Sequence, residues 1–187
     1  MGKVIYSMNV SLDGYVETPD HSLDWALVDD DLHGWWNEQM RRADAVVWGR
    51  RIFELMAAYW PTAPSDPEAT PAMLEFARIV NPKPKVVFST TLREVGWNGR
   101  LASGDVGEAL ARLRNEFEGD LDVAGPRLAH QFVRRGLVDE YRLMVHPVIL
   151  GAGTPFFPRL DAPLRLRQTE VHRFASGVVL LGYSAAS

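Results

Sequence analysis

The sequence contains no cysteine, and this absence excludes several kinds of chemistry. Without thiols the chain forms no disulfide, has no thiolate nucleophile and offers no sulfur ligand to zinc or to an iron–sulfur cluster. The histidines, at positions 21, 33, 130, 146 and 172, show no metal-ligand spacing. We therefore expect no metal site, and the lack of cysteine agrees with a cytoplasmic protein.

Clustered basic residues and long apolar runs are also lacking. The formal net charge is −4, with 20 basic and 24 acidic residues and no clustered basic segment of the kind that binds nucleic-acid phosphates. The most apolar stretches, such as residues 143–150, fall well short of the roughly 20 residues that span a bilayer. The N-terminus shows no signal-peptide core. We expect neither nucleic acid nor a membrane as a partner.

What the sequence does contain is an ordinary globular composition, 47% hydrophobic and 24% charged over 187 residues. A chain of this length can bury roughly 70% of its unfolded surface in one core. We therefore predict a single domain over residues 1–187.

Apolar segments typical of strands alternate with segments of helical periodicity. The sequence predicts strands at residues 4–10, 45–48, 85–88, 121–124, 141–150, 164–173 and 178–183. It predicts helices at residues 30–42, 50–58, 72–80, 105–117 and 126–135, the first capped by Asp30 or Asp31 and the fourth by Asp105. This alternation predicts an α/β fold with a mainly parallel central sheet, helices on both faces and a C-terminal antiparallel strand pair.

Two arginines, Arg50 and Arg51, open the second predicted helix directly after a buried strand and Gly49. A helix N-terminus carries about +0.5 of a charge, so cations there cost roughly a few tenths of a kcal/mol unless an anion lies among them. A phosphate held by helix N–H groups and guanidinium groups would reverse that cost. The alternative is that both arginines point into water, or that one pairs with Glu54.

A second junction repeats this arrangement, because Gly125, Pro126 and Arg127 open another helix after another strand. Two such junctions fit a ligand with several phosphate groups, although Pro126 lacks an N–H and an ordinary strand-to-helix connection is the alternative. Ser89 and Thr90, at the exit of the strand 85–88, add hydroxyl groups where open α/β sheets bind ligands. For these two residues the alternative is simply a polar strand end.

Large aromatic side chains are concentrated between residues 25 and 60. Most belong in a core, but rings near a cofactor loop could also form the walls of a pocket for a flat heterocycle. We assign this substrate-binding role to Trp25. The Gly-Ala-Gly at residues 151–153 begins like a dinucleotide fingerprint, but the segment 154–158 contains two prolines and cannot open a helix, so we reject a Rossmann site.

Several of these segments together resemble a known family. They are Ser-Leu-Asp-Gly at 11–14, Val-Val-Trp-Gly-Arg at 46–50, Ala-Gly-Pro-Arg-Leu at 124–128, Gly-Leu-Val-Asp-Glu at 136–140 and Pro-Val-Ile-Leu-Gly at 147–151. Their order and spacing resemble the C-terminal reductase domain of riboflavin-pathway deaminase-reductases, a branch of the dihydrofolate-reductase-like fold. The resemblance implies that NADPH lies across the sheet, with its phosphates at residues 49–51 and 125–128. It thereby adds Leu128 to the candidate cofactor-binding residues. It also implies that Ser89 and Thr90 lie near the adenosine end.

The chain departs from this family at two positions. Ile52 replaces a hydroxyl residue that family members commonly carry near the cofactor, and Val123 stands where riboflavin-pathway enzymes have a substrate-binding glutamate. The leading interpretation is an NADPH-dependent reductase acting on a small, planar, pterin- or pyrimidine-like substrate that the sequence does not identify. The alternative is a binding protein on the same scaffold that sequesters a planar ligand without chemistry.

The proton that accompanies hydride transfer has three candidate sources. The resemblance implies that the nicotinamide lies near residues 11–14, so that Asp13 and Trp25 border the reacting centre. A carboxyl at Asp13 or Asp31 in a tryptophan-walled pocket would have the raised pKa that a proton donor near neutral pH requires. Ordered water is the third source, because Asp13 also suits a turn before Gly14 and Asp31 also suits a helix cap.

A homodimer is the last expectation. The apolar strand 143–150 is followed by a proline-rich loop, 154–158, with two phenylalanines that a monomer would struggle to bury. Two-fold dimers are also the commonest oligomers.

Overall fold

The computed structural model describes residues 2–186, and its main feature is an eight-stranded sheet with the strand order β5-β4-β3-β6-β1-β7-β10-β9. The strands are β1 (Val4–Ser11), β3 (Ala43–Gly49), β4 (Lys85–Phe88), β5 (Gly99–Ala102), β6 (Asp120–Ala124), β7 (Glu140–His146), β9 (Leu166–Arg173) and β10 (Val179–Ala185). Neighbours from β5 to β7 run parallel, whereas β10 is antiparallel to β7 and to β9. A separate ribbon pairs β2 (Tyr15–Glu17) with β8 (Thr154–Pro155). The predicted fold class is confirmed.

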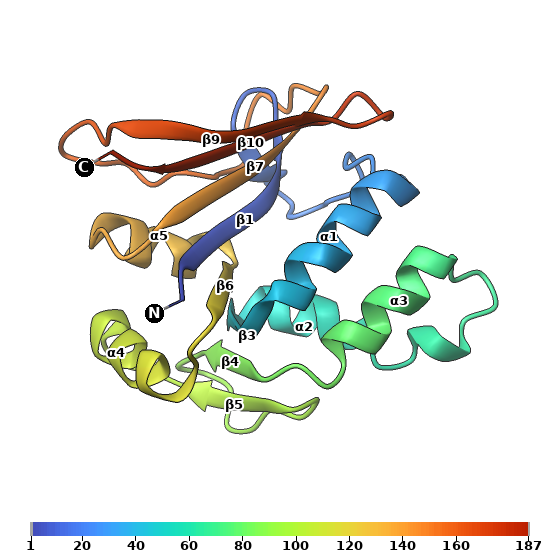
Figure 1. Ribbon diagram of the computed structural model, residues 1–187, viewed down its shortest axis with the longest axis horizontal. Coiled ribbons are helices and arrows are strands. Elements are labelled where there is room, and N and C mark those ends of the chain that lie inside the picture. Colours follow the sequence, from blue (N-terminus) through green and yellow to red (C-terminus); the bar gives the residue numbers. More distant parts are fainter. Residues whose placement is uncertain (1, 187) are drawn as a thin grey trace.

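Helices cover both faces of the sheet (Figure 1). One face carries α1 (Asp30–Arg42), α2 (Arg50–Tyr59) and α3 (Pro71–Val80), and the other carries α4 (Val106–Glu116) and α5 (Pro126–Arg134). A 3-10 turn, η1 (Ala63–Ser65), precedes α3. In the described part of the chain, no helix is long and apolar enough to cross a membrane.

The two faces of the sheet bury different side chains because successive strand residues point to opposite sides. In β3, Val47 packs toward α4 and α5, whereas Val46 and Trp48 pack toward α2 and α3. A third cluster lies under the start of α1, where Leu32 meets Met144 of β7. Because the inner strands of the parallel part, such as β3 and β4, are covered on both faces, they are mostly apolar, which is why they could be recognised from the sequence.

Several predicted boundaries change in the structure. Strand β7 ends at His146 rather than at residue 150, since Pro147 has no N–H to donate to a ladder. The cap of α1 is Asp29, whose Oδ1 accepts the N–H of Leu32 at 2.9 Å, and neither Asp30 nor Asp31, which lie in the first turn. The short strands β2, β5 and β8 were not predicted.

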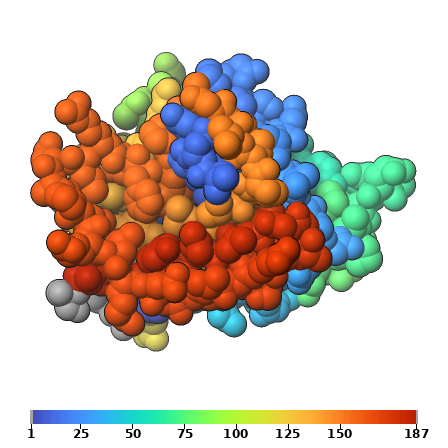
Figure 2. Space-filling model, turned by 90° about the horizontal axis from the view of Figure 1, so that it is seen from above, coloured from blue at the N-terminus to red at the C-terminus, as the bar shows by residue number. Residues whose placement is uncertain are grey.

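The structural argument for a homodimer is weakened, because the chain itself buries Phe156 and partly buries Phe157. Phe156 is 1% exposed and stacks on Tyr6 with ring centroids 4.1 Å apart, and β7 lies between β1 and β10. The turn after β1 lies beside the loop after β7 (Figure 2), and the N–H of Leu12 donates to Val148 O at 2.8 Å. The homodimer itself stays a prediction.

Candidate functional site

Two helices of the structure begin without a side-chain cap. The first, α2, follows Gly49, and the second, α5, follows Gly125; neither has an acidic residue in its first turn. The N–H groups of a first helical turn have no partner within the helix and need one from elsewhere. Since Gly49 supplies none, the first-turn N–H groups of α2 are available to an anionic ligand. At α5, Pro126 has no N–H and the N–H of Leu128 donates to Gly125 O at 3.1 Å, which leaves the N–H of Arg127.

The two uncapped helix starts touch. Gly125 has φ +94°, and a Cβ built there would lie 3.4 Å from Gly49 N and 3.3 Å from Ile52 Cγ2. Gly49 and Gly125 follow the neighbouring strands β3 and β6, and their helices lie on opposite faces of the sheet. Open α/β proteins bind ligands at such a point, where the connections after two neighbouring parallel strands leave toward opposite faces of the sheet.

A cleft of about 980 Å³ opens at this edge of the sheet. Its walls include every cofactor-binding candidate taken from the sequence, namely Gly49, Arg50, Arg51, Ser89, Thr90, Gly125, Pro126, Arg127 and Leu128. These residues come from three separate strand ends, so their meeting depends on the parallel sheet. One end of the cleft carries hydroxyl groups of residues 89–91, and the other is lined by the apolar Met8, Val16 and Leu23.

The three arginines of the cleft differ in how far their charge is neutralised. Among the described residues Arg127 has no carboxylate partner, and Arg50 makes only an exposed pair with Glu54 at 3.4 Å. Arg51 donates to both carboxylate oxygens of Glu17, at 3.2 and 3.1 Å. The cleft therefore offers the cations of Arg127 and Arg50 to a ligand, whereas Arg51 is already bound.

Glu17 is the cleft residue that sequence reasoning missed. It is buried, and burial alone would raise its pKa, but hydrogen bonds from Thr154 and His21 and the charge of Arg51 hold the pKa of this carboxyl below its usual value. Its partners Arg51 and Thr154 lie 34 and 137 residues away, so the nearby His21 alone did not indicate the role.

Trp25 does not line the cleft, in contrast to the expectation from the sequence. Its ring packs edge-on against His146 with centroids 5.3 Å apart. His146 is fully buried, accepts the N–H of Leu27 at Nδ1 (3.1 Å) and lies 3.1 Å from Asn9 Oδ1 at Nε2. Burial lowers the pKa of His146 to about 4, so the imidazole is neutral at physiological pH and fixes the segment before α1 to the end of β7.

The two candidate acids lie apart and outside the cleft walls. The Ser11 hydroxyl, with the N–H groups of Leu150 and Gly151, lowers the pKa of Asp13, which is exposed. Asp31 is exposed in the first turn of α1. The tryptophan-walled pocket that was expected to raise their pKa is therefore absent at both carboxyls.

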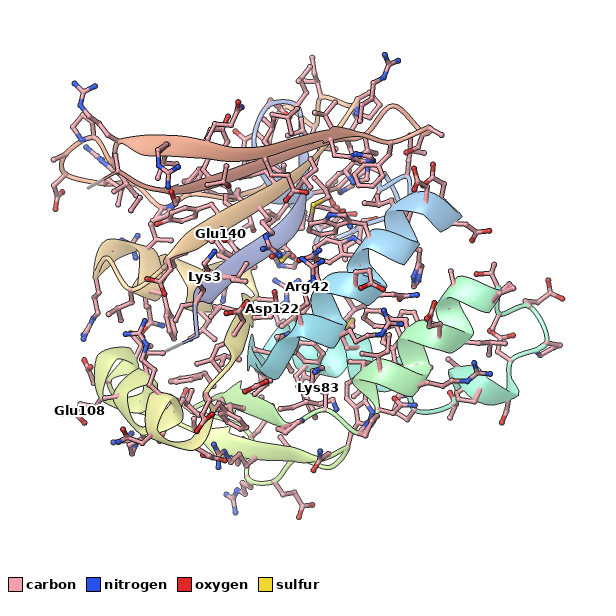
Figure 3. All side chains as sticks on the ribbon, viewed as in Figure 1. Lys3, Arg42, Lys83, Glu108, Asp122 and Glu140 are labelled. Carbon is pink, nitrogen blue, oxygen red and sulfur yellow. The ribbon has the colours of Figure 1, made fainter. Side chains whose placement is uncertain are left out.

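A second group of charged residues lies away from the cleft, under the C-terminal half of α1. Figure 3 shows Asp122 of β6 with Lys3 and Glu140 on one side and Lys83 on the other. Burial raises the pKa of Asp122 to about 7, although the charges of Arg142 and Lys83 lower it. Lys3 and Glu140 form an ion pair at 2.9 Å. This group does not line the cleft.

The protein is therefore an open α/β protein, with helices on both faces of the sheet and a cleft at the carboxyl ends of its parallel strands. Residues 2–180 match the RibD C-terminal domain, and the chain belongs to this family. "Uncharacterized protein YyaP" of Bacillus subtilis (strain 168) is 31% identical over 182 residues, which cover 97% of this chain and 94% of that protein.

Two solved structures show the same fold. A putative riboflavin biosynthesis protein from Shewanella sp. PV-4 has a TM-score of 0.80 at 23% identity and covers 99% of each chain. A dihydrofolate reductase from Enterococcus faecalis, complexed with NADP(H), has a TM-score of 0.68 at 13% identity and covers 100% of this chain and 98% of that one. The dihydrofolate-reductase-like fold implied by the sequence resemblance is therefore confirmed.

Proposed function

We propose that the protein is an NADPH-dependent reductase whose substrate is a small planar heterocycle of the pterin or pyrimidine type. The observation that carries the proposal is the contact between two uncapped helix N-termini, of α2 and α5, inside one cleft. At about 980 Å³ the cleft lies near the upper end of the roughly 300–1,000 Å³ typical of ligand pockets. It is large enough for an extended ligand rather than a single small ring.

The residues of the cleft suit a dinucleotide diphosphate. The first-turn N–H groups of α2 belong to Arg50, Arg51 and Ile52, and the helix dipole favours negative charge there. The absence of side chains at Gly49 and Gly125 lets an anion approach this backbone closely. Arg127, without a carboxylate partner, adds a cation at the start of α5.

The hydroxyl-lined end of the cleft favours NADPH over NADH. Arg50, Ser89 and Thr90 lie together there and would bind the additional phosphate of the adenosine. The Ser89 oxygen already accepts the N–H groups of Thr91 and Leu92, at 3.1 and 2.9 Å, and it lies 3.4 Å from the Thr91 hydroxyl, with either hydroxyl able to donate.

The apolar end of the cleft, with Met8, Val16 and Leu23, would hold the nicotinamide and a flat substrate. When bound, NADPH supplies a hydride, which the proposed reaction adds to a C=N or C=O carbon. Asp13 and Asp31 lie outside the cleft walls, so of the three candidate proton sources we propose ordered water.

One observation favours the alternative of a binding protein. Ile52 lines the cleft where relatives commonly carry a hydroxyl, which removes one polar contact to the cofactor. The reductase and the binding protein are separated by measuring the oxidation of NADPH in the presence of a panel of reducible planar heterocycles, because a binding protein leaves the cofactor unchanged.

The first experiment is a thermal-shift panel with NADPH, NADP and NADH. A ligand present at 100 times its Kd adds about 2.7 kcal/mol to the free energy of unfolding. We expect clear stabilisation by NADPH and NADP and less by NADH at equal concentration. No shift with any of the three would contradict both the reductase and its cofactor.

A further inference from the structure

The carboxylate of Glu17 connects three segments that surround the cleft. Oε1 accepts the hydroxyl of Thr154 at 2.6 Å, and both oxygens accept from the guanidinium of Arg51. His21 Nδ1 lies 2.9 Å from Oε1 and 3.0 Å from Arg51 Nη1. The β2–β8 ribbon, the loop after β2 and the first turn of α2 therefore meet at one carboxylate.

The backbone holds Glu17 in this position from the other side. Gly153 approaches so closely that a Cβ built there would lie 2.0 Å from Glu17 O, and β2 pairs Glu17 with Thr154. Only a glycine fits at this contact. The carboxylate is therefore presented to Arg51 from a fixed strand and not from a mobile loop.

The loop after β2 is a compact turn that docks on α2 through the same pair. The N–H of His21 donates to Thr18 O at 2.9 Å, and the N–H of Ser22 donates to the Thr18 hydroxyl at 2.9 Å. His21, Ser22 and Leu23 all line the cleft. If Arg51 releases Glu17, this turn loses its contact with the helix, and one wall of the cleft loses its support.

From this geometry we infer that the side chains of Arg51 and Glu17 form a positioning pair for the wall of the cleft and that the Arg51 guanidinium is not a phosphate ligand. The assignment rests on the proposed function and gives the two neighbouring arginines different roles. Arg50 binds the additional phosphate of NADPH. Arg51 acts through Glu17 on the segment next to the apolar end, which NADPH and NADH share.

Two signatures distinguish a positioning residue from a phosphate ligand. Loss of a ligand to the additional phosphate of NADPH lowers affinity for NADPH alone. Loss of a ligand to the diphosphate, which both cofactors carry, and loss of wall support each lower affinity for both cofactors, so the second signature has to separate these two cases. A residue that acts through Glu17 also has no further effect once Glu17 is disabled, because contacting residues in one network are not additive.

The experiment measures the Kd of NADPH and NADH by titration calorimetry. The variants are Arg51→Ala, Arg51→Lys, Glu17→Gln, the double variant Glu17→Gln/Arg51→Ala, and Arg50→Ala. Arg112→Ala is the control, because Arg112 makes only an exposed pair with Glu108 on α4.

We expect Arg51→Ala and Glu17→Gln each to weaken both cofactors by roughly tenfold, the range of a lost charge-assisted hydrogen bond. The double variant should be no weaker than either single one, and Arg51→Lys should recover part of the loss for both cofactors. If Arg51→Ala does not fold, Arg51→Lys and Thr154→Val, which removes the hydroxyl donor to Glu17, carry the same comparison.

The outcomes separate this assignment from the proposed function. Loss of NADPH affinity alone in Arg51→Ala, with Glu17→Gln unaffected, would make Arg51 a phosphate ligand and overturn the assignment while leaving the reductase intact. Additive losses in the double variant would also overturn it. Failure of the unmodified protein to bind either cofactor would overturn the proposed function and the assignment together.

Discussion

The α-helices of this protein begin in two different ways. The starts of α1, α3 and α4 are capped by Asp29, Thr70 and Asp105, whose side chains accept first-turn N–H groups. The starts of α2 and α5 follow Gly49 and Gly125 and have no side-chain cap. A cap of this kind stabilises a protein by about 0.5–2 kcal/mol. The two starts that lack it are the two that meet in the cleft.

The difference teaches which N–H groups serve the fold and which are open to a ligand. At the helix starts outside the cleft, a side chain of the protein accepts the hydrogen bonds of the first-turn N–H groups. Where α2 and α5 meet, the chain places glycines and arginines instead, which is unfavourable until an anion arrives. Changing a capped helix start should therefore alter the stability of the protein, whereas changing an uncapped start should alter ligand binding. The two kinds of start can be changed separately.

The largest effect is expected from Gly125→Ala. The new Cβ would push against Ile52 and against the N–H of Gly49, and the positive φ adds backbone strain of roughly 1–2 kcal/mol. Because the opening between the two helix starts closes, several charge-assisted contacts are lost, and the Kd of NADPH should rise roughly 100-fold or more. Calorimetric titration measures it.

Gly136→Ala is the matched control for that variant. Gly136 also has a positive φ, +64°, but a Cβ there meets nothing within 4 Å. It should lower the melting temperature and leave the Kd of NADPH unchanged. Equal loss of NADPH affinity in both variants would mean that backbone strain, and not the contact between the helix starts, controls binding.

A smaller and more selective effect is expected from Arg50→Ala. Loss of one charge-assisted contact costs about 1.5–3 kcal/mol, so NADPH should bind roughly tenfold to a hundredfold more weakly. NADH, which lacks the additional phosphate, should bind as before. If the unmodified protein binds NADPH and NADH equally, the phosphate assignment of Arg50, Ser89 and Thr90 is wrong.

Acidification should affect the two helix starts capped by carboxylates, those of α1 and α4, and spare the start of α3, which the Thr70 hydroxyl caps. The hydrogen bond from Leu32 lowers the pKa of Asp29, and that from Glu108 lowers the pKa of Asp105. A lowered pKa in the folded state means that the stabilisation is fully present above the unfolded value, about 3.9, and is lost as the pH falls through the folded value. Hydrogen exchange below pH 4, corrected for intrinsic rates, should show protection lost in the first turns of α1 and α4.

The first turn of α3 serves as the internal comparison in that experiment, since its cap is the Thr70 hydroxyl, which does not titrate. Equal loss of protection at all three helix starts would show that acid acts on the whole fold and not on the caps.

The elements that could be predicted from the sequence are those whose cause is local. Apolar runs in the sequence indicate the buried strands. Asp105, which accepts the N–H groups of Gly107 and Glu108, was predicted as a cap. The cleft residues of β3, β4 and β6 follow strand ends, and a parallel sheet necessarily brings such ends to one edge. The cap of α1 was misplaced by one or two residues because Asp29, Asp30 and Asp31 are chemically equivalent in the sequence.

The features that could not be predicted depend on partners distant in the chain. Strands β2 and β8 have three and two residues and exist only through their mutual pairing. The pairing of Arg51 with Glu17 spans 34 residues, and Trp25 meets His146 across more than a hundred. Asp13 was expected to be a desolvated acid, but its surroundings are set by the loop after β7, which no local pattern places beside it.

The most direct test of the account gives α2 the cap that it lacks. Gly49 has φ −71° and ψ 157°, a conformation open to any residue, and a Cβ there makes only an ordinary contact with Leu128. In Gly49→Asp the new carboxylate should bind the free N–H groups, so that the ligand-free protein gains roughly a few tenths of a kcal/mol in stability. The Kd of NADPH should rise roughly tenfold, since the ligand loses these donors and meets a negative charge.

Thr70→Ala provides the opposite case, because it removes an existing cap from α3, which lies away from the cleft. It should lower the free energy of unfolding by about 0.5–2 kcal/mol and leave NADPH binding unchanged. Measured together by thermal unfolding and calorimetric titration, Gly49→Asp should thus raise stability and lower affinity. Affinity for NADPH that is unchanged or increased in Gly49→Asp would contradict the claim that the uncapped start of α2 binds the cofactor.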